Sequence, residues 1–171
     1  MVIKFLKLII AGFLLVGSVF LFIEGEISYG ILAILISGIF VLFYFKNPRN
    51  LLALFFVRKN KFLAADKILS SVKNPAVMIK SQEGYFYFLS GLVATQKHEI
   101  SKADKLLKMS LKNGLRMKTD QAVAKLNLAG IALNRRNKKL AKIYVMECKK
   151  LDTRKMLTAQ IKEVEHMMKR I

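Results

Sequence analysis

AADKIL at residues 64–69 and KADKLL at residues 102–107 are nearly the same hexapeptide, 38 positions apart. Two columns of small residues recur at the same interval, 12 positions from each other: Ala65, Ala103 and Ala141, and Ala53, Gly91 and Ala129. Two antiparallel helices can cross closely at such points, because a larger side chain would hold the backbones apart. The interval therefore predicts helix–turn–helix units of 38 residues, with turns near Asn60, His98 and Arg136.

Helix signals continue through residues 47–171. Pro75 is the only proline after Pro48, and residues of high helix propensity dominate. Asn74-Pro75 is typical of an N-cap followed by the first helical position. Asn113-Gly114 is typical of a helix C-terminus, and Thr119 or Asp120 is expected to cap the next helix; these residues follow the second copy.

Apolar residues recur at three- and four-residue intervals near the C-terminus, opposite a charged face. This spacing predicts a one-sided amphipathic helix, which suits the open end of a stack of repeats. The apolar positions are Leu157, Ile161, Val164, Met168 and Ile171.

The first 45 residues differ in composition. Residues 8–23 and 27–45 contain no charged residue and would form helices about 24 and 28 Å long, close to the ~30 Å hydrocarbon core of a bilayer. Only Glu24-Gly25-Glu26 separates them, which favours a transmembrane hairpin over residues 1–46. Glycines in both runs would permit close packing, although glycine is common in transmembrane helices anyway.

Charge predicts the orientation of this hairpin. Lys4 and Lys7 precede it and Lys46 and Arg49 follow it, whereas its turn is acidic. Positive flanks remain on the cytoplasmic side, so we expect a multi-pass protein of a bacterial inner membrane with both termini in the cytoplasm. The formal net charge of +19 then belongs entirely to a second, basic domain, residues 47–171 with the flanking Lys46.

The repeated segments resemble the tetratricopeptide repeat. SGLVATQKHEISKADKLL (residues 90–107) and NLAGIALNRRNKKLAKIYV (residues 127–145) are similar to its pair of small residues 12 positions apart. The period of 38 departs from the 34 of that family, and only Tyr87 suits its tryptophan position. The resemblance covers residues 49–151. It implies an all-α protein: the hairpin, then an α-solenoid of about three such helical hairpins, then a capping helix.

The resemblance also implies a concave groove that binds a peptide segment of a partner protein. The groove residues it implies are Tyr85, Phe88, Leu92, Gln96, Asn127 and Asn134.

Stacked repeats place equivalent positions side by side, which predicts a basic edge. Its residues are Arg58, Lys59, Lys97, Arg135 and Arg136. Such an edge would attract a partner with an acidic segment. The alternatives are docking on anionic lipid head groups, nucleic-acid binding, or simply a solvated face.

The sequence contains no motif typical of a catalytic or metal-binding site. His98 and His166 lie far apart, and Cys148 stands alone, which predicts neither a metal site nor a disulfide. No phosphate-binding glycine loop or nucleophile elbow is present. We therefore expect a membrane-anchored adaptor or scaffold that is not an enzyme and needs no cofactor.

Overall fold

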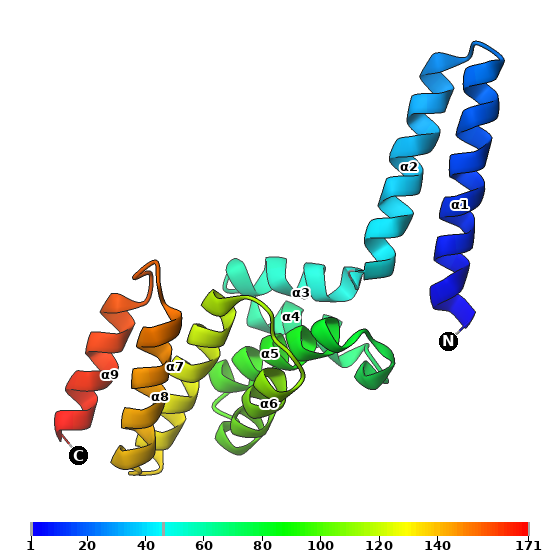
Figure 1. Cartoon of the computed structure of the whole chain (residues 1–171). Helices are drawn as coiled ribbons and strands as arrows, with labels where there is room; N and C mark the ends of the chain where they lie inside the picture. Colours follow the sequence, from blue (N-terminus) through cyan, green and yellow to red (C-terminus); the bar gives the residue numbers. More distant parts are fainter. Residues whose placement is uncertain (1, 46, 171) are drawn as a thin grey trace. The chain divides into compact units, whose positions relative to one another are not determined.

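The computed structural model describes residues 2–45 and 47–170, except for the side chains of residues 2–5, 7, 8 and 42–45. The expected flanking side chains of Lys4, Lys7 and Lys46, and Ile171 of the amphipathic helix, therefore lie outside the described residues. The chain divides into two compact units, Met1–Leu51 and Leu52–Ile171. The described residues contain helices and no strand, which confirms the all-α class (Figure 1).

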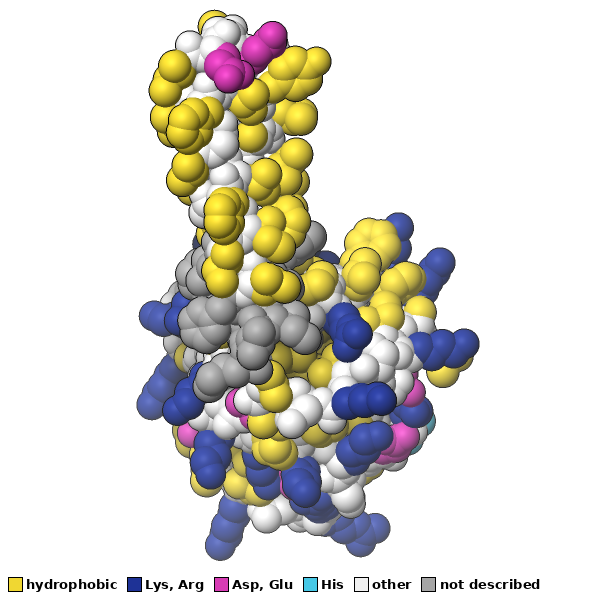
Figure 2. Space-filling model, turned by 90° about the vertical axis from the view of Figure 1, so that its right-hand side faces the viewer, with side chains coloured by type: hydrophobic (Ala, Val, Ile, Leu, Met, Phe, Trp, Pro, Cys, Tyr) yellow, Lys and Arg dark blue, Asp and Glu magenta, His cyan; other side chains and the backbone are white. Residues whose placement is uncertain are grey.

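The first unit is an antiparallel pair of helices, α1 (Val2–Ile23) and α2 (Ile27–Phe45). Gly25 turns the chain with φ +86°, a value that favours glycine, and the Glu26 N–H donates to the carbonyl of Leu21 at 2.9 Å. Hydrophobic side chains cover the visible face of this hairpin, and acidic side chains mark its tip (Figure 2). Among the described residues, no helix is both long enough and apolar enough to cross a membrane.

Small residues form the interface between α1 and α2. Among the described side chains of these helices, the buried positions are Ala11 and Ser18 on one helix and Gly30 and Ser37 on the other, seven residues apart in each. The Ser37 hydroxyl donates to the Ala11 carbonyl at 2.9 Å, and a Cβ on Gly30 would lie 2.8 Å from the Phe22 ring. A Cβ on any of the other three glycines within these helices would meet no described atom within 4 Å. Among the described side chains, close contact at a glycine is therefore seen at Gly30.

Residues 47–170, which the structure describes, contain seven further α-helices, of which α3 crosses the boundary between the two units. They are α3 (Pro48–Arg58), α4 (Phe62–Ser70), α5 (Lys80–Gln96), α6 (Ile100–Lys112), α7 (Lys118–Asn134), α8 (Lys138–Leu151) and α9 (Thr158–Arg170). A short 3-10 helix, η1 (Pro75–Val77), precedes α5. The helices α5 and α6 pack as one hairpin and α7 and α8 as the next, each following the expected interval of 38 residues.

The three predicted turns are confirmed. Asn60, His98 and Arg136 adopt left-handed backbone conformations with φ of 56°, 58° and 54°. After each, the next amide bonds back to a carbonyl in the last helical turn; that of Glu99, for example, reaches Ala94 at 2.9 Å. This pair of features is the Schellman ending of a helix, here formed three times without glycine.

The small-residue columns lie where the paired helices cross. Ala65, Ala103 and Ala141 are fully buried, as are Ala53 and Ala129. A Cβ on Gly91 would lie 2.7 Å from Leu107 Cδ2 and 3.3 Å from the Leu107 amide nitrogen. The recurrence of small residues therefore reflects a steric requirement, as expected.

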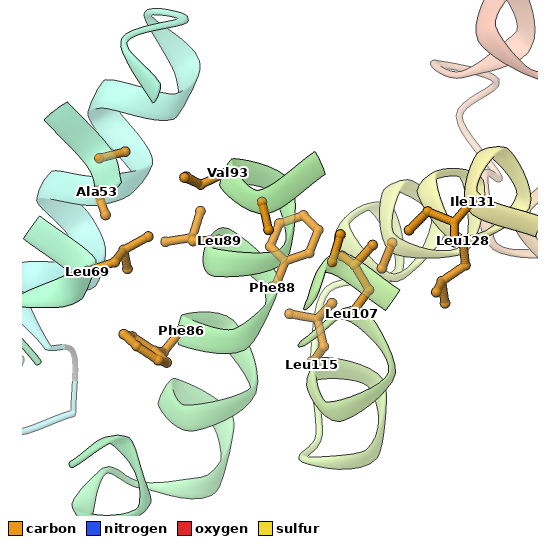
Figure 3. Packing of buried hydrophobic residues seen from close by; sticks show 14 residues of the cluster. Ala53, Leu69, Phe86, Phe88, Leu89, Val93, Leu107, Leu115, Leu128 and Ile131 are labelled. Carbon is orange, nitrogen blue, oxygen red and sulfur yellow. The ribbon is translucent and has the colours of Figure 1, made fainter. Parts of the chain in front are cut away.

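Two apolar clusters form the core of the second unit. The first joins Leu69, Leu89, Leu107, Leu115 and Leu128 (Figure 3). The second extends from α7 and α8 to α9, whose Ile161 and Val164 are buried as the amphipathic pattern predicted. This places α9 against α7 and α8.

Helix boundaries differ in part from expectation. Asn113 and Gly114 end α6 as predicted, with Gly114 at φ +82°. Pro75 begins only the 3-10 helix, and Asn74 provides no side-chain cap. The prediction that Thr119 or Asp120 caps α7 is wrong, because the helix already begins at Lys118. Both residues lie in the first turn, where the negative charge of Asp120 interacts favourably with the helix dipole.

Candidate functional site

The repeated hexapeptide positions an acidic residue for an ion pair with the next repeat. Asp66 accepts a hydrogen bond from Lys97 at 2.8 Å, and Asp104 accepts one from Arg135 at 3.0 Å. Each pair joins residues 31 positions apart, and the two pairs are related by the interval of 38. The aspartate in AADKIL and KADKLL therefore contributes to repeat stacking.

The second of these pairs has the more shielded aspartate, because the Asp104 side chain is 16% exposed and that of Asp66 is 36% exposed. Burial of the half-buried Asp104 raises its pKa, but the hydrogen bonds and charges of Lys108 and Arg135 together have a larger, opposite effect. The pKa of Asp104 therefore lies below its ordinary value. In the first pair, the hydrogen bond to Asp66 raises the pKa of Lys97, and Glu99 adds to this effect. The ion pair thus stabilises the charged form of Lys97.

The predicted basic edge therefore has mixed roles. Lys97 and Arg135 bind aspartates of the preceding repeat. The Lys59 ammonium lies 4.3 Å from the centroid of the Phe55 ring, and Arg136 occupies a left-handed turn position. Arg58 is exposed, and its charge acts on Tyr85 of the predicted groove instead. The sequence did contain a signal for these ion pairs: each recurring aspartate is followed 31 residues later by a lysine or an arginine.

The six predicted groove residues divide into buried and accessible ones. Phe88 is buried in the core, and Tyr85 packs against its ring at a centroid distance of 5.9 Å. Leu92 and Asn127 are half-buried, and the Asn127 side-chain amide donates to the Val123 carbonyl at 2.8 Å. Gln96 and Asn134, at equivalent ends of α5 and α7, are exposed. Phe88 is therefore unavailable to a ligand, because its aromatic side chain fills the space between repeats.

Tyr85, Asp120 and Arg58 form the most distinctive polar environment of this surface. Burial, with a smaller effect of Asp120, raises the pKa of Tyr85 to about 12, so its hydroxyl remains a hydrogen-bond donor at neutral pH. Burial also raises the pKa of Asp120, which the Arg58 charge opposes. Within the described part of the chain, the buried Oδ2 of Asp120 accepts no hydrogen bond. The arrangement can bind a backbone or side-chain donor of a peptide.

Repeat stacking also leaves a recurring cleft on the side of the ion pairs. The first cleft, about 200 Å³, is lined by residues of α4, α5 and α6 and their connections, including Asp66 and Lys97. The second, about 140 Å³, is lined by Asp104, Arg135 and other residues of α6, α7 and α8. Each residue lining the second cleft lies 38 positions after one lining the first. The sequence analysis did not predict these clefts.

The histidines and the cysteine are separated in the structure. His98 is an exposed turn residue and His166 is exposed on α9. Cys148 is buried, and burial, with a smaller effect of Asp152, raises the pKa of its thiol to about 11. The described residues contain no group of three or more His, Cys, Asp or Glu side chains arranged to hold a metal ion.

Comparison with protein-family models, with curated proteins and with solved structures gave no match to this chain.

Proposed function

We propose that the chain is a membrane-anchored helical-repeat adaptor that binds a protein partner at the cytoplasmic face of a bacterial inner membrane. The observation that carries this proposal is the inverted polarity of the hairpin. Its large apolar side chains point outward, with Phe13 75% and Leu35 63% exposed, whereas Ser18 and Ser37 are buried between the helices. In water, each exposed side chain of this size would forgo about 1.5–3 kcal/mol of burial free energy.

Lipid surroundings account for the buried serines as well. The Ser18 hydroxyl donates to the Leu15 carbonyl at 2.7 Å, and that of Ser37 donates to Ala11 on the other helix. Small and hydroxylated residues are the usual contacts between helices in a bilayer, where every polar group needs an internal partner. The proposal rests on the complete apolar runs, residues 8–23 and 27–45, which extend beyond the described side chains.

Charge supports the orientation. Glu24 and Glu26 are the only charged residues of the turn, whereas basic residues precede and follow the hairpin. By the positive-inside rule, both termini and the repeat unit would be cytoplasmic.

The repeat unit supports the adaptor role. It consists of helical hairpins repeated every 38 residues, and we propose a tetratricopeptide-like array as its architecture. Its proposed groove offers the exposed side chains of Gln96 and Asn134 and, nearer the other end of α5 and α7, the Tyr85–Asp120–Arg58 environment. A large positive charge would speed encounter with an acidic partner segment, and the groove would supply selectivity.

Docking of the basic unit on anionic lipid head groups is the second candidate. A hairpin in the same membrane would hold it nearby, and each lysine or arginine close to the surface would contribute about 1 kcal/mol. Binding of nucleic acid uses the same charge but lacks a supporting reading element among the described helices, so it ranks below the lipid surface.

In-cell crosslinking of the full chain, with nuclease treatment and mass spectrometry, tests the adaptor role. The informative variant is Gln96→Glu with Asn134→Asp, which adds two negative charges at exposed groove positions. The matched control, Ser101→Asp with Gln160→Glu, adds the same charge at exposed positions elsewhere.

We expect a discrete protein that survives nuclease, is lost from the groove variant and is retained by the control. Recovery of lipids or nuclease-sensitive material alone would refute the adaptor role.

A further inference from the structure

The helix α9 occupies the place of the first helix of a fourth repeat. Counting back 38 and 76 residues from α9 leads into α7 and α5. Met167 then corresponds to Gly91 and Ala129, the buried points at which the second helix of each earlier repeat crosses the first. Met167 is 40% exposed, and no second helix covers it in the part of the chain that the structure describes.

The cleft beside α9 is correspondingly the third member of the recurring series. The first two clefts are each closed by the second helix of the following repeat, through Leu106 on α6 and Tyr144 on α8. The third is lined by α8 and α9 only and has a volume of about 670 Å³, against about 200 and 140 Å³ for the others. Among the described residues, the third cleft therefore lacks the wall that α6 and α8 give to the first two.

The chemistry of the third cleft differs from that of the first two. Lys142 stands at the position of Asp66 and Asp104, so the acidic partner of the earlier ion pairs is replaced by a cation. Five lysines line the cleft: Lys138, Lys142, Lys149, Lys162 and Lys169. Its one carboxylate, Glu165, is bound to Lys149 at 2.7 Å.

The cleft also has an apolar floor. Val145 is buried, Met168 is half-buried, and Met146 is 47% exposed. Methionine side chains adapt their shape to an incoming apolar surface more readily than branched ones. The surface thus combines an apolar strip with a lysine border, the pattern that accepts an amphipathic helix in a groove.

We infer that the α8–α9 cleft binds an amphipathic α-helix of a partner protein, with an apolar stripe facing Met146 and Met168 and acidic residues facing the lysines. The partner helix takes the place that α6 and α8 take in the earlier repeats. This inference rests on the adaptor function proposed above and names the chemistry of the partner segment.

Charge and shape favour this occupant over others. A second copy of the chain would bring a net charge of +19 to a surface that is already basic. Lipid head groups and nucleic-acid phosphates would match the lysines but would leave the exposed Met146 of the cleft without an apolar partner. A helix with two unlike faces satisfies both parts of the site.

Binding of a defined peptide to the full-length protein in detergent micelles tests the inference. The probe is a fluorescent 20-residue helix with leucine at i, i+3, i+4 and i+7 and glutamate on the opposite face. A peptide of identical composition in scrambled order is the control. Titrations by fluorescence anisotropy use the wild type, Lys142→Glu with Lys162→Glu, and Met146→Ser. The matched surface variant is Lys105→Glu with Lys150→Glu, which makes the same change in charge at exposed positions of α6 and α8 outside the cleft lining.

We expect the patterned peptide to bind about tenfold more tightly than the scrambled one. The double lysine variant of the cleft and Met146→Ser should each weaken it about tenfold, and the double surface variant Lys105→Glu with Lys150→Glu should change it less than about twofold. Equal binding of the two peptides, or equal effects of the cleft and surface variants, would overturn the inference. Competition would overturn it as well. If phosphatidylserine vesicles or an oligonucleotide displaced the peptide, and if the cleft variants bound that competitor more weakly than the wild type, the cleft would be a site for lipid or nucleic acid instead.

In-cell crosslinking distinguishes failure of the α8–α9 inference from failure of the adaptor role. If the wild type and the cleft variants crosslink to the same partner equally well, the α8–α9 site is refuted and the adaptor function is not. Loss of every protein partner would remove the adaptor function itself.

Discussion

The two units of this chain build helical hairpins with opposite distributions of polarity. Between α1 and α2 the buried residues are small or hydroxylated, and the exposed ones are large and apolar. In the second unit, large residues such as Leu89 and Leu107 are buried, and lysine and arginine side chains are spread over the face seen in Figure 2. The two kinds of hairpin thus differ in which residue types face the partner helix. The predictions below perturb the two units in matched pairs, in order of decreasing effect.

Truncation of a leucine should distinguish the units most clearly. Leu89→Ala opens a cavity in the repeat core and should lower the free energy of unfolding by about 2–5 kcal/mol. Leu35→Ala, on the outside of the hairpin, should leave unfolding of the repeat unit unchanged. Thermal and urea unfolding of the full chain in detergent, followed by circular dichroism, measures both. Equal losses would contradict the division.

Introduction of a lysine should affect the hairpin strongly and the repeat unit little. Leu35→Lys places a charge near the middle of α2 and should make membrane insertion less favourable by about 3 kcal/mol. Ile143→Lys, at an exposed position of α8, should change stability by less than about 0.5 kcal/mol. The fraction retained in liposomes after alkaline washing measures insertion. An unaffected Leu35→Lys protein would argue against a lipid environment for α2.

Glycine at a repeat turn should stabilise the second unit. Arg136 holds a left-handed conformation that favours glycine, so Arg136→Gly should raise the free energy of unfolding by about 1 kcal/mol. Asn60→Gly should gain less, because asparagine tolerates this conformation better. Urea denaturation measures both. A loss of stability in Arg136→Gly would show that the arginine side chain has a structural contact of its own.

The ion pairs between repeats should give the smallest effect. A double-mutant cycle on Asp104 and Arg135 should yield a coupling of about 0.5 kcal/mol that falls at high salt. The pKa of Asp104 is lowered in the folded protein, so its contribution should be complete above the ordinary aspartate range and be lost as pH falls through the folded value. A cycle on Asp104 and Arg136 is the control and should show no coupling.

Sequence periodicity was sufficient for much of the second unit. The small residues at Ala65, Gly91 and Ala103 determine the crossing points, and the left-handed residues appear at the turns that the interval of 38 predicted. Such features depend on one local steric requirement repeated along the chain, so a single sequence contains enough information to find them.

Features that depend on two repeats at once were harder to predict. Phe88 was assigned to the groove but lies in the core, because the rotation of α5 relative to its neighbours decides which face is covered. The pairing of Lys97 with Asp66 and the wide cleft beside α9 depend on how successive repeats stack. In the hairpin, glycine positions alone did not indicate which of them faces the partner helix.

Cysteine labelling in intact cells tests the anchored arrangement most directly. Wild-type protein supplies the blank, because its Cys148 is buried. With a membrane-impermeant maleimide, Glu26→Cys in the α1–α2 turn should be labelled from outside the inner membrane, whereas Arg170→Cys at the end of α9 should be labelled only after the membrane is broken. Labelling of both sites only after breakage would contradict a hairpin that crosses the bilayer, and with it the anchored adaptor.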